Sequence, residues 1–137
     1  MYLLDTNVIS ELRRGKRGQS PAVRAWAQAQ PLARLYLSAI TVLELELGAL
    51  QIERRDPAQA QVLRAWLEAV LTDFDGRVLP FAGTTALRCA PLHVPDPASF
   101  RDSMIAATAL EHGFAVVTRN AADFATSAVP VVDPWQG

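Results

Sequence analysis

The chain has 137 residues, of which half are hydrophobic and a fifth are charged, and this balance excludes an intrinsically disordered or low-complexity protein. Its 13 basic and 14 acidic residues leave a formal net charge of -1 at pH 7, which excludes a general attraction to nucleic acids or to anionic membranes. One cysteine and two histidines exclude an internal disulfide and a zinc site built from several cysteines or histidines.

The longest apolar stretches are interrupted by acidic residues before they reach the roughly 18 residues that a membrane span requires. The first residues show neither a basic segment nor a long apolar run, so no export signal is expected. We therefore expect a single domain over residues 1–137, located in the cytoplasm and without a membrane partner.

The first part of the chain predicts two strands separated by two helices. A short apolar run over residues 2–4 ends at Asp5, and apolar residues at helical spacing predict a helix over 6–14. A proline at the first helical position predicts a second helix over 21–30, and residues 35–38 predict the second strand.

A basic segment follows the first predicted helix, with four basic residues among the five from 13 to 17. Two interpretations of this segment stay open, a solvated loop and a loop that contacts phosphate.

The middle of the chain predicts two long helices, over residues 39–53 and 57–74. The second has an aspartate in the N-cap position and a proline in the first helical position. Both helices are rich in leucine, and the second carries a regular apolar stripe.

The last part predicts a third strand over residues 77–81, a short helix over 84–89 and a longer helix over 97–112. Asp96 is expected to cap the longer helix, because Pro97 suits the position after an N-cap. The remaining strands are expected at 114–118 and, at the edge of the sheet because of its proline, at 129–132.

Strands that alternate with helices predict an α/β fold with a mostly parallel sheet of four to five strands, flanked by helices on both faces. In such sheets ligands bind beyond the carboxyl ends of the strands. Polar residues at those ends are therefore the candidates for a functional site.

Three acidic residues stand out by position. Asp5 follows the first strand, where it either caps the next helix or belongs to a site. Glu44 and Asp102 have mainly apolar neighbours three and four positions away, and a carboxylate on such a face needs a partner. Glu46 lies about 200° around the helix from Glu44 and also has apolar neighbours, so only one of the two can serve a common site, and the helical pattern leaves open which one. We expect Glu44, because it lies in the segment Thr41-Val42-Leu43-Glu44-Leu45 that carries the resemblance given below.

Converging carboxylates destabilise a fold unless a cation neutralises them, because two at 4 Å repel by about 4 kcal/mol at an effective dielectric constant of 20. Lys16 is the only lysine, and the arginines are expected to lie elsewhere. We therefore expect a divalent ion, Mg²⁺ or Mn²⁺, held by carboxylate oxygens. Such an ion can activate water and neutralise charge on a phosphate.

Four segments carry a resemblance to a known family: Leu4-Asp5-Thr6-Asn7; Thr41-Val42-Leu43-Glu44-Leu45; the run from Asp102 to Leu110; and Val117-Thr118-Arg119-Asn120 with Asp123-Phe124. Their residues, order and spacing resemble the PIN-domain ribonucleases, specifically the VapC-type toxins of bacterial toxin–antitoxin pairs. The resemblance extends from Asp5 to Pro134.

The resemblance implies that Asp5, Glu44 and Asp102 ligate Mg²⁺ or Mn²⁺ and that water attacks an RNA phosphate. A fourth acidic position of the family is occupied here by Asn120, which can ligate through its amide oxygen, while Asp123 lies three residues further on and can act through water. The resemblance also makes further residues candidates for orienting the acids and the water: Thr6, Asn7, Ser38 and Thr118.

The resemblance further implies a homodimer that is inhibited by a cognate antitoxin. Because a cation blocks an acidic pocket best, we expect the antitoxin to insert an arginine or lysine among the three acids. Grooves near Trp26 and Leu43 are candidates for an apolar segment of the same partner.

Two alternatives remain. One is a PIN-like module that binds RNA or protein with weak or no catalysis, and the other is an aspartyl phosphatase with Asp5 as its nucleophile. A phospho-accepting receiver domain is disfavoured because it needs a lysine after its last strand, and no nucleophilic triad is visible around Cys89, His93 or His112.

Overall fold

In the computed structural model, which describes residues 1–136, five parallel strands form one sheet in the order β3-β2-β1-β4-β5. The central strand is therefore the first one in the chain, which places its carboxyl end in the middle of one edge of the sheet. The strand bounds are β1 Tyr2–Leu4, β2 Leu35–Ser38, β3 Val78–Leu79, β4 Ala115–Val117 and β5 Val131–Val132.

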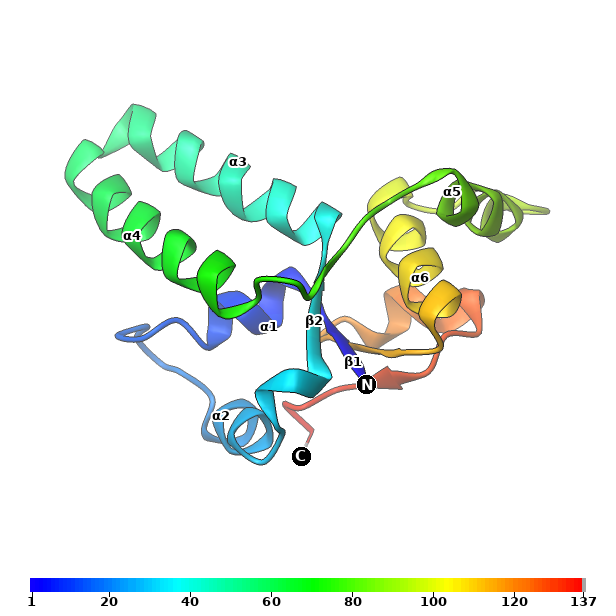
Figure 1. Ribbon diagram of the computed structural model, residues 1–137, viewed down its shortest axis with the longest axis horizontal. Helices are drawn as coiled ribbons and strands as arrows, with labels where there is room; N and C mark the ends of the chain where they lie inside the picture. The colour runs from blue at the N-terminus through cyan, green and yellow to red at the C-terminus, as the bar shows by residue number, and fades with distance from the viewer. Residues whose placement is uncertain (137) are drawn as a thin grey trace.

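Helices cover both faces of this sheet and extend beyond it as two arms (Figure 1). The long antiparallel pair α3 and α4 forms one arm, and α5 and α6 form the other. The helix bounds are α1 Thr6–Glu11, α2 Pro21–Gln28, α3 Ala39–Arg55, α4 Pro57–Asp73, α5 Gly83–Cys89 and α6 Phe100–His112, with 3₁₀ turns η1 Leu32–Arg34, η2 Ala90–His93 and η3 Ala121–Ser127.

Alternation of side chains along the strands builds a core on each side of the sheet. Leu4 and Val117 pack with Leu37 and α1, α2 and α4 on one side, whereas Leu3 and Val116 pack with α6 and η3 on the other. These strand residues are at most 1% exposed. The predicted parallel sheet, covered on both faces, is confirmed.

Most predicted elements are present, and the first two strands have the predicted bounds. The first helix ends at Glu11 rather than at residue 14, because Gln19 donates a hydrogen bond to the Glu11 carbonyl at 2.7 Å and the chain turns away. The basic segment 13–17 follows in this turn, and its Lys16 pairs with the Glu11 carboxylate at 2.7 Å.

The start of the last long helix was predicted wrongly. Asp96 is not its N-cap, because α6 begins at Phe100 with Ser99 as N-cap. The residues before it are held in a loop, where the Ala98 amide donates to the His93 ring at 3.3 Å. As a result Asp102 lies in the first turn of α6 rather than six residues into the helix.

Among the described residues, none of the helices combines the length and the hydrophobicity that crossing a bilayer demands.

Candidate active site

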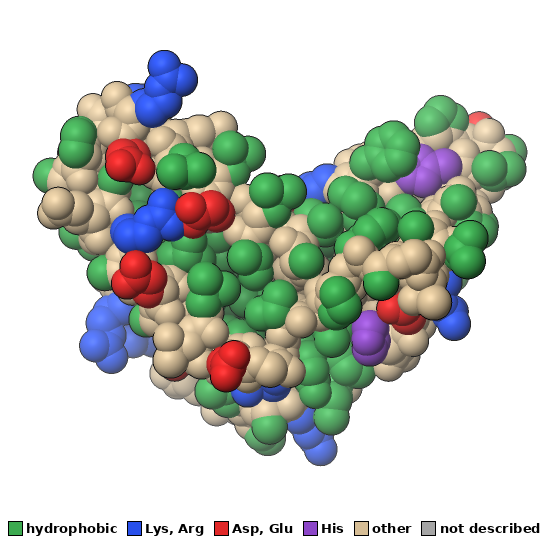
Figure 2. Space-filling model, turned by 45° about the horizontal axis from the view of Figure 1, so that its top comes forward, with side chains coloured by type: hydrophobic (Ala, Val, Ile, Leu, Met, Phe, Trp, Pro, Cys, Tyr) green, Lys and Arg blue, Asp and Glu red, His purple; other side chains and the backbone are tan. Residues whose placement is uncertain are grey.

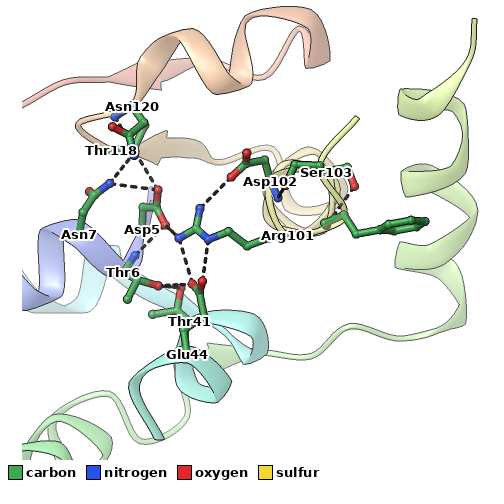
Figure 3. A network of polar contacts seen from close by, with 12 residues as sticks. Asp5, Thr6, Asn7, Thr41, Glu44, Arg101, Asp102, Ser103, Thr118 and Asn120 are labelled. Carbon is green, nitrogen blue, oxygen red and sulfur yellow. Dashed lines mark hydrogen bonds and ion pairs between the residues drawn. The ribbon is translucent and has the colours of Figure 1, made fainter. Parts of the chain in front are cut away.

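Three carboxylates from distant parts of the chain meet beyond the carboxyl end of the central strand (Figure 3). Asp5 lies between β1 and α1, Glu44 lies in the second turn of α3, and Asp102 lies in the first turn of α6. The three acids selected from the sequence are thus brought together by the ends of three separate elements.

A fourth residue, Arg101, lies at the point where the carboxylates converge. Its Nη2 donates to Asp5 Oδ1 at 2.5 Å and to Glu44 Oε1 at 2.9 Å, its Nε donates to Glu44 Oε2 at 2.7 Å, and its Nη1 donates to Asp102 Oδ1 at 2.8 Å. The expectation that the arginines lie away from the acids is therefore wrong. The guanidinium bonds all three acids because its planar array of N–H groups serves several carboxylates at once.

The charges of this cluster shift the pKa values of two of its members. Burial favours the neutral form of Arg101, but the hydrogen bonds to Glu44 and Asp5 outweigh it and raise the pKa of the guanidinium. Burial likewise acts to raise the pKa of Glu44, but the bonds from Arg101 and Thr6 outweigh it and lower that pKa. One positive charge faces three negative ones, so the pocket keeps a formal charge of -2.

Asp5 is fully buried, and in addition to the bond from Arg101 its carboxylate accepts hydrogen bonds from other groups. The Thr6 amide donates to Oδ1 at 2.7 Å, the Thr118 hydroxyl donates to Oδ2 at 2.8 Å, and Asn7 Nδ2 lies 3.5 Å from Oδ2. The Asn7 amide oxygen in turn accepts from the Arg119 amide at 3.2 Å. The strand end, α1 and the segment after β4 together orient this carboxylate.

Glu44 is held in a similar way from the opposite side. The Thr6 hydroxyl donates to Oε1 at 2.6 Å and lies 3.3 Å from the Thr41 hydroxyl. Ser38 is one step further away, because it caps α3 by accepting from the Thr41 amide at 3.0 Å and contacts the Thr41 hydroxyl at 3.3 Å. Ser38 therefore supports the helix that carries Glu44 rather than the carboxylate itself.

Within the part of the chain that the structure describes, the side chains of the two candidates for a fourth ligand make no hydrogen bond to the three acids. The Asn120 amide donates to the Thr118 hydroxyl at 3.0 Å, and its side chain is exposed. Asp123 is exposed in η3 and lines a small cavity of about 30 Å³ together with Asp102.

Helix geometry separates Glu44 from Glu46. Glu46 points away from the acidic pocket and pairs with Arg64 of α4, and both side chains are partly exposed. Two residues of the pocket were not selected from the sequence, namely Arg101 and Thr41. Their signals were their positions, next to Asp102 and three residues before Glu44 on the same helical face.

The first turn of α6, which carries Arg101 and Asp102, is anchored from behind. The Ser103 hydroxyl lies 2.8 Å from His93 Nε2 and accepts a weak bond from the buried Cys89 thiol at 3.4 Å. The His93 ring packs against Phe100 with 4.5 Å between centroids. These contacts tie α5, η2 and α6 together and hold the two site residues at the pocket.

The oxygens of the pocket are of the kind that Mg²⁺ and Mn²⁺ prefer, since all three acids are hard carboxylate ligands. Four carboxylate oxygens already face a single cationic group, Arg101. With the guanidinium between them, no three acidic, histidine or cysteine residues among 1–136 lie close enough to hold a metal ion directly. The donor set fits a divalent ion, provided that Arg101 moves away.

Two of the hollows that border α4 also border α1. A cavity of about 420 Å³ opens between α1, α2 and α4, and its lining combines apolar residues such as Leu12, Ala27 and Trp66 with charged ones such as Arg24 and Asp73. A groove of about 210 Å³ between α1, α3 and α4 reaches Thr6 and Glu44. Grooves were predicted near Trp26 and near the Leu-rich stretch around Leu43, and the neighbouring residues Ala27 and Leu45 line these hollows. Trp26 itself packs against Tyr2, and Leu43 is 60% exposed.

The chain is similar to known proteins over nearly its whole length. The family model of the PIN domain matches residues 2–128. The chain is 40% identical to the VapC ribonuclease Y4jK of Sinorhizobium fredii over 99% of both chains. The crystal structure of FitAcB from Neisseria gonorrhoeae superposes with a TM-score of 0.90 at 38% identity over the whole of both chains. A toxin–antitoxin complex from Klebsiella pneumoniae superposes with a TM-score of 0.70 at 29% identity over 98% of both chains.

Proposed function

The chain belongs to the PIN-domain family, and from this premise we propose that it is a metal-dependent endoribonuclease acting as the toxin of a toxin–antitoxin pair. The observation that carries the proposal is the convergence of Asp5, Glu44 and Asp102 on one cationic centre at the carboxyl end of the central strand. A relative of nearly equal length is called a ribonuclease, which supports the same activity.

In this mechanism the three carboxylates hold Mg²⁺ or Mn²⁺. When bound, the ion supplies an activated water and neutralises charge on the RNA phosphodiester. Thr6, Asn7 and Thr118 orient the acids through the bonds described above. The fourth ligand is either Asn120, through its amide oxygen, or Asp123, which shares a small cavity with Asp102 and can act through water.

The extent of the domain belongs to the same proposal. The family model ends at residue 128, but β5 pairs in parallel with β4 beyond that point. We therefore assign the whole chain, residues 1–137, to one PIN domain acting in the cytoplasm, where its RNA substrate is found.

The decisive experiment compares RNA cleavage by the wild type, Asp5→Asn and Asp75→Asn, each with Mg²⁺, with Mn²⁺ and with EDTA. We expect cleavage to require the metal and Asp5→Asn to lose about 100-fold or more, because metal assistance contributes several kcal/mol to such reactions. Asp75 is exposed in a turn before β3, so its variant serves as the control.

Two outcomes would contradict the proposal. Cleavage that persists in EDTA and in Asp5→Asn would exclude the metal-dependent mechanism. Binding of RNA without cleavage under all metal conditions would favour the alternative of a non-catalytic binding module.

The proposed partners are an antitoxin and a second copy of the chain. The similar toxin–antitoxin complex supports the first, and the cavity between α1, α2 and α4 is large enough to receive side chains of a partner helix. For the homodimer, α3 exposes Leu43, Leu47 and Leu50 by 46–60%. Hydrophobic side chains also gather in the hollow between the two arms (Figure 2). Light scattering of the purified toxin should give twice the mass of one chain.

A further inference from the structure

We propose that Arg101 is a built-in counterion of the acidic pocket, which takes the place of the divalent ion in the metal-free protein and must leave when the metal binds. The proposal, which rests on the metal site proposed above, assigns a role to a residue that had no role in the reasoning from the sequence.

The guanidinium and a metal ion need the same carboxylate oxygens. Arg101 takes up Asp5 Oδ1, both oxygens of Glu44 and Asp102 Oδ1. A dication among these oxygens would lie against a positive guanidinium, and like charges at contact distance repel. The two cations therefore exclude one another from the pocket.

The Arg101 side chain is free to leave the pocket, whereas the carboxylates of Asp5 and Glu44 are held by further hydrogen bonds. The Arg101 side chain is 32% exposed and extends from the first turn of α6 on a long flexible stem, so it can turn toward solvent. Asp5 and Glu44, by contrast, also accept bonds from Thr6 and Thr118, which do not involve Arg101. The carboxylate oxygens are thus positioned for a metal ion independently of Arg101. A purely structural ion pair would not require carboxylates that are held in this way.

The net charge of the pocket also favours an exchange of Arg101 for a divalent ion. With Arg101 in place the pocket retains a formal charge of -2, which still attracts a divalent ion. Without the arginine the three carboxylates would repel one another until a metal arrives. Arg101 therefore stabilises the metal-free pocket and, for the same reason, weakens metal binding.

The test measures Mn²⁺ binding by calorimetry, without RNA, for the wild type, Arg101→Gln and Arg64→Gln. Arg64→Gln removes an equal charge from another acid–arginine pair, that with Glu46, and is the matched control. We expect Arg101→Gln to bind Mn²⁺ at least about tenfold more tightly, because several charge-assisted hydrogen bonds no longer compete. The control should stay within about twofold of the wild type, since Arg64 does not compete for the pocket.

A second measurement uses the wild type alone and does not depend on the folding of a variant. In ¹⁵N spectra the Arg101 Nε–H, bonded to Glu44 Oε2, should shift or broaden as Mg²⁺ saturates the protein. The Arg77 Nε–H, bonded to the Leu35 carbonyl at 3.0 Å, should stay unchanged.

The outcomes separate this inference from the proposed function. Equal Mn²⁺ affinities of wild type and Arg101→Gln, or an Arg101 signal unchanged at saturating Mg²⁺, overturn the exchange and leave the metal site intact. Absence of metal binding in every variant overturns both.

Discussion

Glu44 and Glu46 are two residues apart in α3, and their surroundings give them different roles. Glu44 accepts bonds from Arg101 and Thr6 in the pocket, whereas Glu46 pairs with Arg64 at the surface. We predict that Glu44→Gln lowers the RNA cleavage rate about 100-fold through loss of a metal ligand. Glu46→Gln should keep the rate within about twofold, since exposed ion pairs contribute little.

Cleavage assays at equal protein and metal concentration check this pair. If Glu46→Gln were the inactive variant, the segment from Thr41 to Leu45 would have been aligned wrongly with the family motif.

The buried carboxylate of Glu11 makes the stability of the fold depend on pH. Its hydrogen bond with Lys16 and the bond from the Ser20 amide, each 2.7 Å long, hold the pKa of Glu11 below its ordinary value of 4.5. A carboxylate with a lowered pKa stabilises the fold above 4.5, and this contribution is lost as the pH falls through its pKa in the folded state.

We therefore predict that Glu11→Gln lowers the free energy of unfolding by about 1 kcal/mol at neutral pH, the usual contribution of such a hydrogen bond. The difference from the wild type should shrink below pH 4.5. Urea unfolding at several pH values measures it, and a difference that grows in acid would contradict the assignment.

At the scale of elements, a glycine at the end of a helix and a glycine inside a helix should respond to substitution in opposite ways. Gly113 ends α6 with φ +70°, a conformation that disfavours any side chain, whereas Gly48 lies inside α3 with ordinary helical geometry. A Cβ atom at either position would meet no neighbour within 4 Å. The backbone alone therefore decides the effect of a substitution.

We predict that Gly113→Ala destabilises the protein by about 1–2 kcal/mol through strain in the left-handed region. Gly48→Ala should stabilise it by about 0.5–1 kcal/mol, because alanine loses less entropy in a helix. Thermal unfolding of the two variants measures both effects, and shifts of the same sign would refute this account.

At the scale of the whole molecule, the cavity between α1, α2 and α4 exists only because three helices from distant parts of the chain surround it. Ala27 of α2 lines this cavity, and Ala65 of α4 lines a separate groove of about 340 Å³ between α3 and α4. Substitutions of the two alanines can therefore distinguish two possible binding sites for the antitoxin.

We predict that Ala27→Arg weakens antitoxin binding at least about tenfold, because the long side chain would occupy the cavity that a partner side chain has to enter. Ala65→Arg should bind normally, and both variants should cleave RNA at the wild-type rate without antitoxin. Binding titrations with the antitoxin measure the difference. The reverse pattern would place the antitoxin between α3 and α4.

Local patterns were sufficient for much of the fold. Apolar runs predicted β1 and β2 with their observed bounds, and alternation of strands with helices predicted the parallel sheet. Helix ends were less predictable, because a residue far along the chain can compete for the same backbone group. The start of α6 illustrates this, since His93 holds Ala98 in the preceding loop and Ser99 caps the helix instead of Asp96.

The sequence by itself determined which side chains are available for chemistry and where the sheet presents them. Asp5 and Asp102 could be selected because the first follows a strand end and the second lies among apolar helical neighbours, which are local properties, whereas the choice of Glu44 over Glu46 came from the resemblance of the segment Thr41–Leu45. The position of Arg101 was decided only by the tertiary structure. A long side chain in this position can extend into solvent or into the pocket, and two of the three carboxylates that hold it lie 96 and 57 residues away in the chain.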